Sequence, residues 1–238
     1  MENQLSLKKN IDKFSETSYN IMCTSVASSR IRGNACSGYL TEDSGDVSMR
    51  VITGIARGRR LKAPEGLDVR PTADKVKEAV FSAVQFQLEG TYVLDLFAGS
   101  GQMGIEALSR GAKRAVFVDS SRAAISCIND NLRATGFERC SEVISRDSFD
   151  FIRLTRQSFG VIILDPPYRH GHIDTVLPIA AAKLQEGGCI ICEYESEAET
   201  PATPEGLVLR KNYRYGKINV TIFDKPLPDE DGGEDDEA

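Results

Sequence analysis

The chain has 238 residues, and its formal net charge of −6 is set by its C-terminus. The last ten residues carry seven acids, and without them the net charge changes from −6 to +1. The length suits one domain with a sizeable core, and no apolar run is long enough to span a membrane. We therefore expect a near-neutral domain over residues 49–226 and a disordered acidic tail over residues 227–238.

Residues 1–48 are rich in Ser, Asn and Thr and show no sustained hydrophobic period. No apolar segment has the length of a signal peptide, and scattered acids argue against a transit peptide. We expect a disordered extension, or one that results from the choice of start site, because Met49 directly precedes the first convincing strand. The cysteines show no disulfide framework, which favours a reducing, cytoplasmic location.

Residues 49–62 carry five cations and no acid. Gly54 and Gly58 favour a short β-hairpin, within a basic segment that we extend to residue 69. In a near-neutral body, such a segment is typical of an arm that contacts nucleic-acid phosphates, with a solvated surface hairpin as the alternative. The cations assigned to RNA contact are Arg50, Arg57, Arg59, Arg60, Lys62 and the later Arg70.

A helix over residues 75–84 is predicted from a face of alanines and valines. Thr72 is its candidate N-cap. Because this helix would pack beside the glycine loop that follows, its amino-terminal end could hold an anionic group of a ligand. Thr72 is therefore included among the cofactor-binding residues.

Residues 92–96 predict a buried strand that leads into a glycine turn and a second helix. Gly99 and Gly101 allow backbone conformations and close approaches that other residues resist. With Gly104 they match the dinucleotide fingerprint formally. Asp95, however, would repel a diphosphate at this position, whereas S-adenosylmethionine presents an ammonium and a sulfonium there. The charge of Asp95 therefore favours a methyl donor over NAD.

Two further strands end in acids. Asp119 lies about 20 residues beyond the glycine turn, where an acid would accept hydrogen bonds from ribose hydroxyls. Asp147 is placed to accept from an adenine amino group, although a strand-end Asp is also a common helix N-cap. Phe97, in the glycine loop, completes the predicted cofactor contacts. The remaining elements are predicted as helices over residues 102–110, 123–134 and 173–184, and strands over residues 115–119, 142–147, 161–165, 189–193, 207–213 and 218–223.

Cys189 and Cys192 have the spacing of redox and metal-binding pairs. They fall in a predicted strand, where residues three apart point to opposite faces. Their thiols would therefore diverge, and no metal site is expected. His170 and His172 are interpreted as surface or substrate-loop residues.

The strand over residues 161–165 is apolar until Asp165, as is typical of a central parallel strand. Pro166 and Pro167 end it, because neither can donate to the sheet ladder. The Asp165 carboxylate and the carbonyl of Pro166 would accept both hydrogens of an exocyclic base amine and direct its lone pair toward a methyl donor. Tyr168 would receive the base once it has left its stack. The motif predicts amine methylation, with residues 165–168 as the catalytic group.

These motifs resemble, over residues 49 to about 225, bacterial 16S ribosomal RNA guanine-N2 methyltransferases of the RsmD type. The matching segments are residues 50–54, 70–81, 94–101, 104–111 and 165–168, together with Asp119. The resemblance implies S-adenosylmethionine as donor and one guanine of 16S rRNA, in the small ribosomal subunit or its assembly intermediate, as target. Ser82 and Lys77 depart from the Asn and Arg that are usual in the family.

We therefore expect an α/β protein with the Rossmann-like class I methyltransferase fold. Its seven-stranded sheet would be mostly parallel, with an antiparallel C-terminal hairpin and a short N-terminal basic β-hairpin. The enzyme would be cytoplasmic, monomeric and independent of membranes. Two alternatives remain open. A DNA adenine-N6 methyltransferase shares the Asp-Pro-Pro-Tyr motif but usually carries a large target-recognition domain, and a non-catalytic RNA-binding module would not need that motif.

Overall fold

A computed structural model gives the fold of residues 49–64, 74–166 and 172–228. Four residues of the predicted site lie outside these ranges, as do the N-terminal extension and most of the acidic tail. These four are Arg70, Thr72, Pro167 and Tyr168. None of the helices within the described ranges combines the length and apolar character that crossing a bilayer requires.

The described residues form an α/β fold. The strands are β1 (Tyr92–Asp95), β2 (Arg114–Asp119), β3 (Ser141–Ser145), β4 (Phe159–Leu164), β5 (Leu184–Glu195), β6 (Val208–Tyr215) and β7 (Ile218–Asp224). The helices are α2 (Asp74–Ala83), α3 (Gln85–Leu88), α4 (Gln102–Ser109), α5 (Arg122–Thr135), α6 (Ser148–Leu154) and α7 (His172–Ala181), and a 3-10 turn spans Glu138–Cys140.

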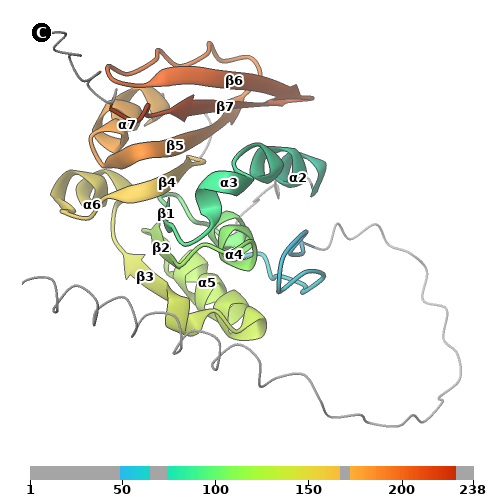
Figure 1. Cartoon of the computed structure of the whole chain (residues 1–238). Coiled ribbons are helices and arrows are strands. Elements are labelled where there is room, and N and C mark those ends of the chain that lie inside the picture. The colour runs from blue at the N-terminus through green and yellow to red at the C-terminus, as the bar shows by residue number, and fades with distance from the viewer. Residues whose placement is uncertain (1–48, 65–73, 167–171, 229–238) are drawn as a thin grey trace, which may run out of the picture. The chain divides into compact units, whose positions relative to one another are not determined.

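The seven strands form one sheet in the order β3-β2-β1-β4-β5-β7-β6. The neighbours from β3 to β5 are parallel, whereas β7 runs antiparallel to both β5 and β6. Helices α2 to α5 cover one face and α6 and α7 the other (Figure 1). The strand order reverses between β1 and β4, and ligands of such sheets bind at the carboxyl ends of the strands beside that point.

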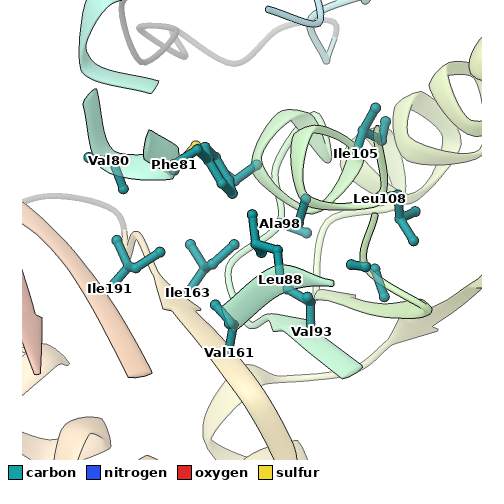
Figure 2. Packing of buried hydrophobic residues seen from close by; sticks show 14 of the residues in the cluster. Val80, Phe81, Leu88, Val93, Ala98, Ile105, Leu108, Val161, Ile163 and Ile191 are labelled. Carbon is teal, nitrogen blue, oxygen red and sulfur yellow. The ribbon is translucent and has the colours of Figure 1, made fainter. Parts of the chain in front are cut away.

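The predicted sheet is confirmed, including the C-terminal hairpin. β4 occupies the middle of the strand order and is buried at every position, as its continuous apolar run predicted. The core lies on both sides of it. Figure 2 shows one side, where Val80 and Phe81 of α2 pack with Ile163 of β4 and Ile191 of β5. Because side chains alternate along strands, residue 165 continues the face of Ile163.

The two cysteines of β5 lie on opposite faces of the sheet, as predicted. Cys189 belongs to the core beneath α2 and α4, and Cys192 belongs to the core beneath α6 and α7. Burial raises the pKa of Cys189 to about 12 and raises that of Cys192 as well. The two thiols therefore cannot converge on one ligand.

The largest differences from the sequence prediction concern four elements. Helix α6, between β3 and β4, was not predicted, and α3 adds a short turn after α2. Helix α7 ends at Ala181 rather than at residue 184, because Leu184 already pairs with Phe159 in the sheet. Consequently β5 begins five residues earlier than the predicted start at Cys189.

Residues 49–62, called the basic arm from here on, fold back on themselves but do not form two strands. One isolated antiparallel bridge joins Arg50 and Arg60. Beside it, the Val51 N–H donates to the Arg59 carbonyl (3.0 Å) and the Leu61 N–H donates to the carbonyl of Met49 (2.8 Å). Four other main-chain N–H groups of the arm donate to helix α4 instead of a partner strand, and that of Lys62 donates to helix α5.

Glu106 of α4 is fully buried and holds the first half of the arm. Its carboxylate accepts hydrogen bonds from the Ile52 N–H (2.7 Å) and the Thr53 N–H (3.0 Å). The Arg110 Nε donates to the same carboxylate (2.8 Å). A buried charge is tolerated when donors of this kind satisfy it. The arm is therefore part of the folded domain.

Ser109, one turn further along α4, holds the tip of the arm. Its hydroxyl donates to the Thr53 carbonyl (2.6 Å) and accepts from the Ala56 N–H (3.0 Å). The Ser109 carbonyl accepts from the Ile55 N–H (2.9 Å). A Cβ at Gly54 would lie 1.7 Å from that carbonyl oxygen, and the φ of Gly54 is +87°. The approach of arm to helix therefore requires glycine.

We expect Gly54→Ala to weaken the docking of the arm, with a loss of about 2–4 kcal/mol in the free energy of unfolding. Gly58→Ala is the matched control, because Gly58 has a similar φ of +82° but no atom within 4 Å of the added Cβ. Backbone strain alone should cost that variant about 1 kcal/mol. Urea denaturation of the full chain measures both, and equal losses would contradict the packing argument.

Candidate active site

The loop between β1 and α4 has the backbone conformation that its glycines predicted. Gly99 has a φ of +53° and Gly101 a φ of +78°, both in the left-handed region that glycine tolerates best. The Gly101 N–H donates to the Ala98 carbonyl (2.6 Å) and closes a tight turn. Helix α4 starts directly afterwards, so the loop lies at the carboxyl end of β1, beside the strand reversal.

Asp95 lies beneath this loop, where the sequence predicted it. It is 1% exposed, and its Oδ2 accepts a hydrogen bond from the Gly104 N–H (2.9 Å). The pKa of its carboxyl is raised to about 7, chiefly by burial and to a smaller extent by the charge of Asp119, whereas the hydrogen bond from Gly104 lowers it. A positively charged ligand above the loop would favour the ionised form.

Asp119 joins the loop to the end of β2. One carboxylate oxygen accepts from the Gly99 N–H (2.9 Å) and the other from the Ser121 N–H (2.8 Å). Because each carboxylate oxygen has two acceptor sites, both oxygens retain capacity for a further donor. The structure therefore brings Asp119 to the glycine loop, while its contact with ribose stays a prediction.

Asp147 is the N-cap of α6, and its carboxylate accepts from the Asp150 N–H (3.0 Å). The helix-cap alternative is therefore realised, and the contact with adenine stays a prediction. Phe97 packs edge-on against Phe149 of the same helix, with ring centroids 6.3 Å apart and planes at 74°. The two rings place aromatic surface beside the loop.

Asp165 follows directly on β4 and is half-buried, and Pro166 after it is buried. Leu164 is in register with Cys192 of β5, so the next residue pair is Asp165 and Glu193. Burial raises the pKa of the Asp165 carboxyl, and the negative charges of Glu193 and Asp95 raise it further. Asp165 therefore lies in an acidic, poorly solvated environment at the carboxyl end of the sheet.

Sequence reasoning missed Glu193, which is 4% exposed. It continues the sheet face of Ile191, and Asp165 continues that of Ile163, so the two carboxylates share one face. The sequence signal that could have revealed it is a single acid within the apolar run of β5.

Within the described ranges, no group of three or more His, Cys, Asp or Glu has the arrangement of a metal site. The acids are suited to accepting hydrogen bonds from N–H groups.

The exposed face of the basic arm carries its cations. Arg50 pairs with Asp74 (2.9 Å) and Lys62 pairs with Asp130 (2.9 Å). The arm's other three cations are exposed, and no ion pair links them to the described residues. These are Arg57, Arg59 and Arg60. The arm therefore offers three cations to an anionic partner, together with Ile55, which is 82% exposed.

Lys77 of α2 connects this helix to the arm. The side chain is 1% exposed, and its Nζ donates to the carbonyl of Arg50 (2.8 Å). Burial lowers the pKa of its ammonium. The residue therefore serves the packing of the arm.

Asp95→Asn should make the protein's stability less sensitive to pH. The variant keeps an oxygen that can accept from Gly104 but cannot ionise. In the wild type, the folded-state pKa of about 7 exceeds the ordinary value of 3.8, so stability present below about pH 4 is lost as pH rises through 7. Relative to wild type, the free energy of unfolding of the variant should increase by up to about 4 kcal/mol between about pH 4 and pH 8.

Urea denaturation across that pH range measures the effect. Asp150→Asn, at an exposed position of α6, is the control for loss of a carboxylate. A difference between Asp95→Asn and wild type that stays constant with pH would show that the buried carboxyl does not titrate as described.

Residues 49–224 match the protein family described as conserved hypothetical protein 95. A putative rRNA methyltransferase of Bacillus subtilis, YlbH, is 38% identical over 182 residues, covering 74% of this chain and 99% of the relative. Ribosomal RNA small subunit methyltransferase D of Escherichia coli is 30% identical over 184 residues, covering 76% of this chain and 92% of the relative.

The fold is similar to solved structures as well. A putative methyltransferase of Escherichia coli, yhhF, superposes with a TM-score of 0.68 at 28% identity, over 75% of this chain and 98% of that protein. The match in sequence spans the glycine loop, the Asp165 motif and the basic arm. The chain therefore belongs to the conserved hypothetical protein 95 family, the family of the RsmD-type methyltransferases that its motifs predicted.

Proposed function

We propose that this protein transfers a methyl group from S-adenosylmethionine to the exocyclic N2 amine of a guanine in 16S rRNA. The observation that carries the proposal is the position of Asp165 and Pro166. They follow the central strand at its carboxyl end, next to the glycine loop of β1. The relatives named above, which are described as rRNA methyltransferases, support RNA as the substrate.

The residues around the loop fit S-adenosylmethionine, which supplies a positively charged, transferable methyl group. The buried Asp95 carboxylate would repel a diphosphate and attract the amino group of the cofactor. Asp119 retains acceptor capacity for ribose hydroxyls. Phe97 supplies an aromatic surface for the adenine, and Asp147 lies at the start of the same helix as Phe149. We include Thr72 in this site on its sequence position alone.

Asp165 would act as a hydrogen-bond acceptor for the reacting amine. Its carboxylate and the carbonyl of Pro166 each accept one amine hydrogen, so the nitrogen lone pair points at the donor. The carboxylate stabilises the positive charge that develops on nitrogen and accepts a proton from the methylated amine. Pro167 and Tyr168 would complete the motif, with the Tyr168 ring stacked on the extruded base.

The basic arm would hold the RNA by its phosphates. Arg57, Arg59 and Arg60 are exposed and carry no ion pair to described residues, so they are available for such contacts. We propose that Arg50 and Lys62 contribute as well, with their carboxylate partners exchanged for phosphates, and we include Arg70 on its sequence position alone. The target would be 16S rRNA of the small ribosomal subunit or its assembly intermediate, and the enzyme would act as a cytoplasmic monomer.

Transfer of labelled methyl groups tests the proposal. We expect label to enter 16S rRNA or small subunits isolated from cells that lack this enzyme, at the N2 position of one guanine. Asp165→Asn should reduce the rate at least about 100-fold, because the acceptor loses its charge, while cofactor binding persists. Asp174→Asn, an exposed acid of α7, is the matched control.

Three outcomes would contradict it. Label in duplex DNA would favour an adenine methyltransferase, and tight RNA binding without label would favour a binding module. Full activity of Asp165→Asn would refute the role of that carboxylate.

Glu193→Gln should extend activity to lower pH. The reaction needs ionised Asp165, whose pKa is raised first by burial and then by the charge of Glu193. Removing that charge lowers the pKa of Asp165, so its ionised fraction persists further into the acidic range. The acidic limb of the pH–rate profile, measured under single-turnover conditions, should therefore shift to lower pH. A limb that stays in place or shifts to higher pH would show that the charge of Glu193 does not raise the pKa of Asp165.

A further inference from the structure

Asn131 of α5 connects the basic arm to the glycine loop. The side chain is 1% exposed. Its Oδ1 accepts from the Lys62 N–H (2.8 Å), and its Nδ2 donates to the carbonyl of Lys62 (3.0 Å) and to the carbonyl of Ser100 (2.9 Å). Lys62 is the last residue of the arm, and Ser100 lies between the two glycines of the loop. One buried amide therefore holds both segments.

Neighbouring contacts tie the same two segments together. The Ser100 hydroxyl donates to the Met49 Sδ (3.7 Å) at the start of the arm. The Cys127 Sγ donates to the Lys62 carbonyl (3.2 Å) from the preceding turn of α5. The start of the arm therefore contacts Ser100 directly and its last residue is linked to Ser100 through Asn131, while its middle is held by Glu106 and Ser109 of the helix that follows the loop.

We propose that Asn131 is a positioning residue that makes cofactor binding and RNA binding mutually favourable. The inference rests on the proposed function, in which the loop holds S-adenosylmethionine and the arm holds RNA. A ligand that orders the loop fixes the Ser100 carbonyl and, through the Asn131 amide, the main chain of Lys62. The second ligand then meets a partner that is already ordered, so its binding requires less loss of conformational freedom.

Measured affinities test the coupling. The dissociation constant of a 16S rRNA transcript is measured with the full-length protein, with and without saturating S-adenosylhomocysteine, which cannot react. In the wild type we expect the cofactor product to tighten RNA binding about five- to tenfold. RNA should tighten binding of S-adenosylhomocysteine by the same factor, because binding linkage is reciprocal. Asn131→Ala should reduce both factors to less than about twofold.

Asn129→Ala is the matched control. It removes the same side chain from the same helix, but among the described residues the Asn129 Nδ2 donates only to the Ile125 carbonyl of that helix (2.8 Å). Its coupling should equal that of the wild type. If Asn131→Ala does not fold, Asn131→Ser replaces it, since the shorter side chain cannot reach both carbonyls. Circular dichroism and urea denaturation establish the folded state of each variant.

Retained coupling in the folded Asn131 variant would overturn the inference, as would loss of coupling in Asn129→Ala. A wild type that methylates 16S rRNA but binds the two ligands independently would overturn this inference alone. A wild type that neither binds nor methylates 16S rRNA would overturn the proposed function and the coupling together.

Discussion

The hydrogen bond from the Gly104 N–H to the buried Asp95 carboxylate is the constraint on which the site depends. It joins the last residue of β1 to the first turn of α4, so the loop between them has fixed ends. The same carboxylate is desolvated, which makes its charge unfavourable in the free protein. The residue therefore fixes the ends of the loop, and a cationic ligand bound there would compensate its charge. The ionised Asp95 carboxylate would therefore lower the folding stability of the free protein while it raises the affinity for a cationic ligand.

A second buried acid, Glu106, connects the basic arm to the same helix. It lies two residues after Gly104, on the helix that Asp95 anchors, and holds the basic arm by its main chain. The loop at one end of α4 and the arm along its side therefore share one support. Asp165 stands at the neighbouring strand end. The proposed donor site, base site and phosphate contacts are thus attached to adjacent parts of one core.

Sequence periodicity and motif spacing predicted the sheet, because strands buried on both faces read as continuous apolar runs. They also placed Asp95, Asp119 and Asp165 at strand ends, since an acid that terminates such a run marks the carboxyl edge. The docking of the arm was not predictable in the same way. It depends on main-chain donors that meet Glu106 and Asn131 from more than fifty residues away, and hydrophobic patterning carries no information on such contacts.

The short helix α6 was missed for a related reason. Its seven residues present too few turns for a period to stand out, and the acid that starts it was read chiefly as a ligand contact. The possible cap at Asp147 was the local signal for the helix. Glu193 was overlooked because its significance arises only from the register of β4 and β5, which brings it beside Asp165.

The way in which the arm is held has an evolutionary consequence. Helices α4 and α5 bind the arm through its main chain. Side chains of α4 accept from the N–H groups of Ile52, Thr53 and Ala56, and the Asn131 amide of α5 bonds to the N–H and carbonyl of Lys62. Apart from the glycine at 54, these bonds do not depend on which side chains the arm presents to solvent. The outward side chains of the arm can therefore change without loss of the arm's position on the domain.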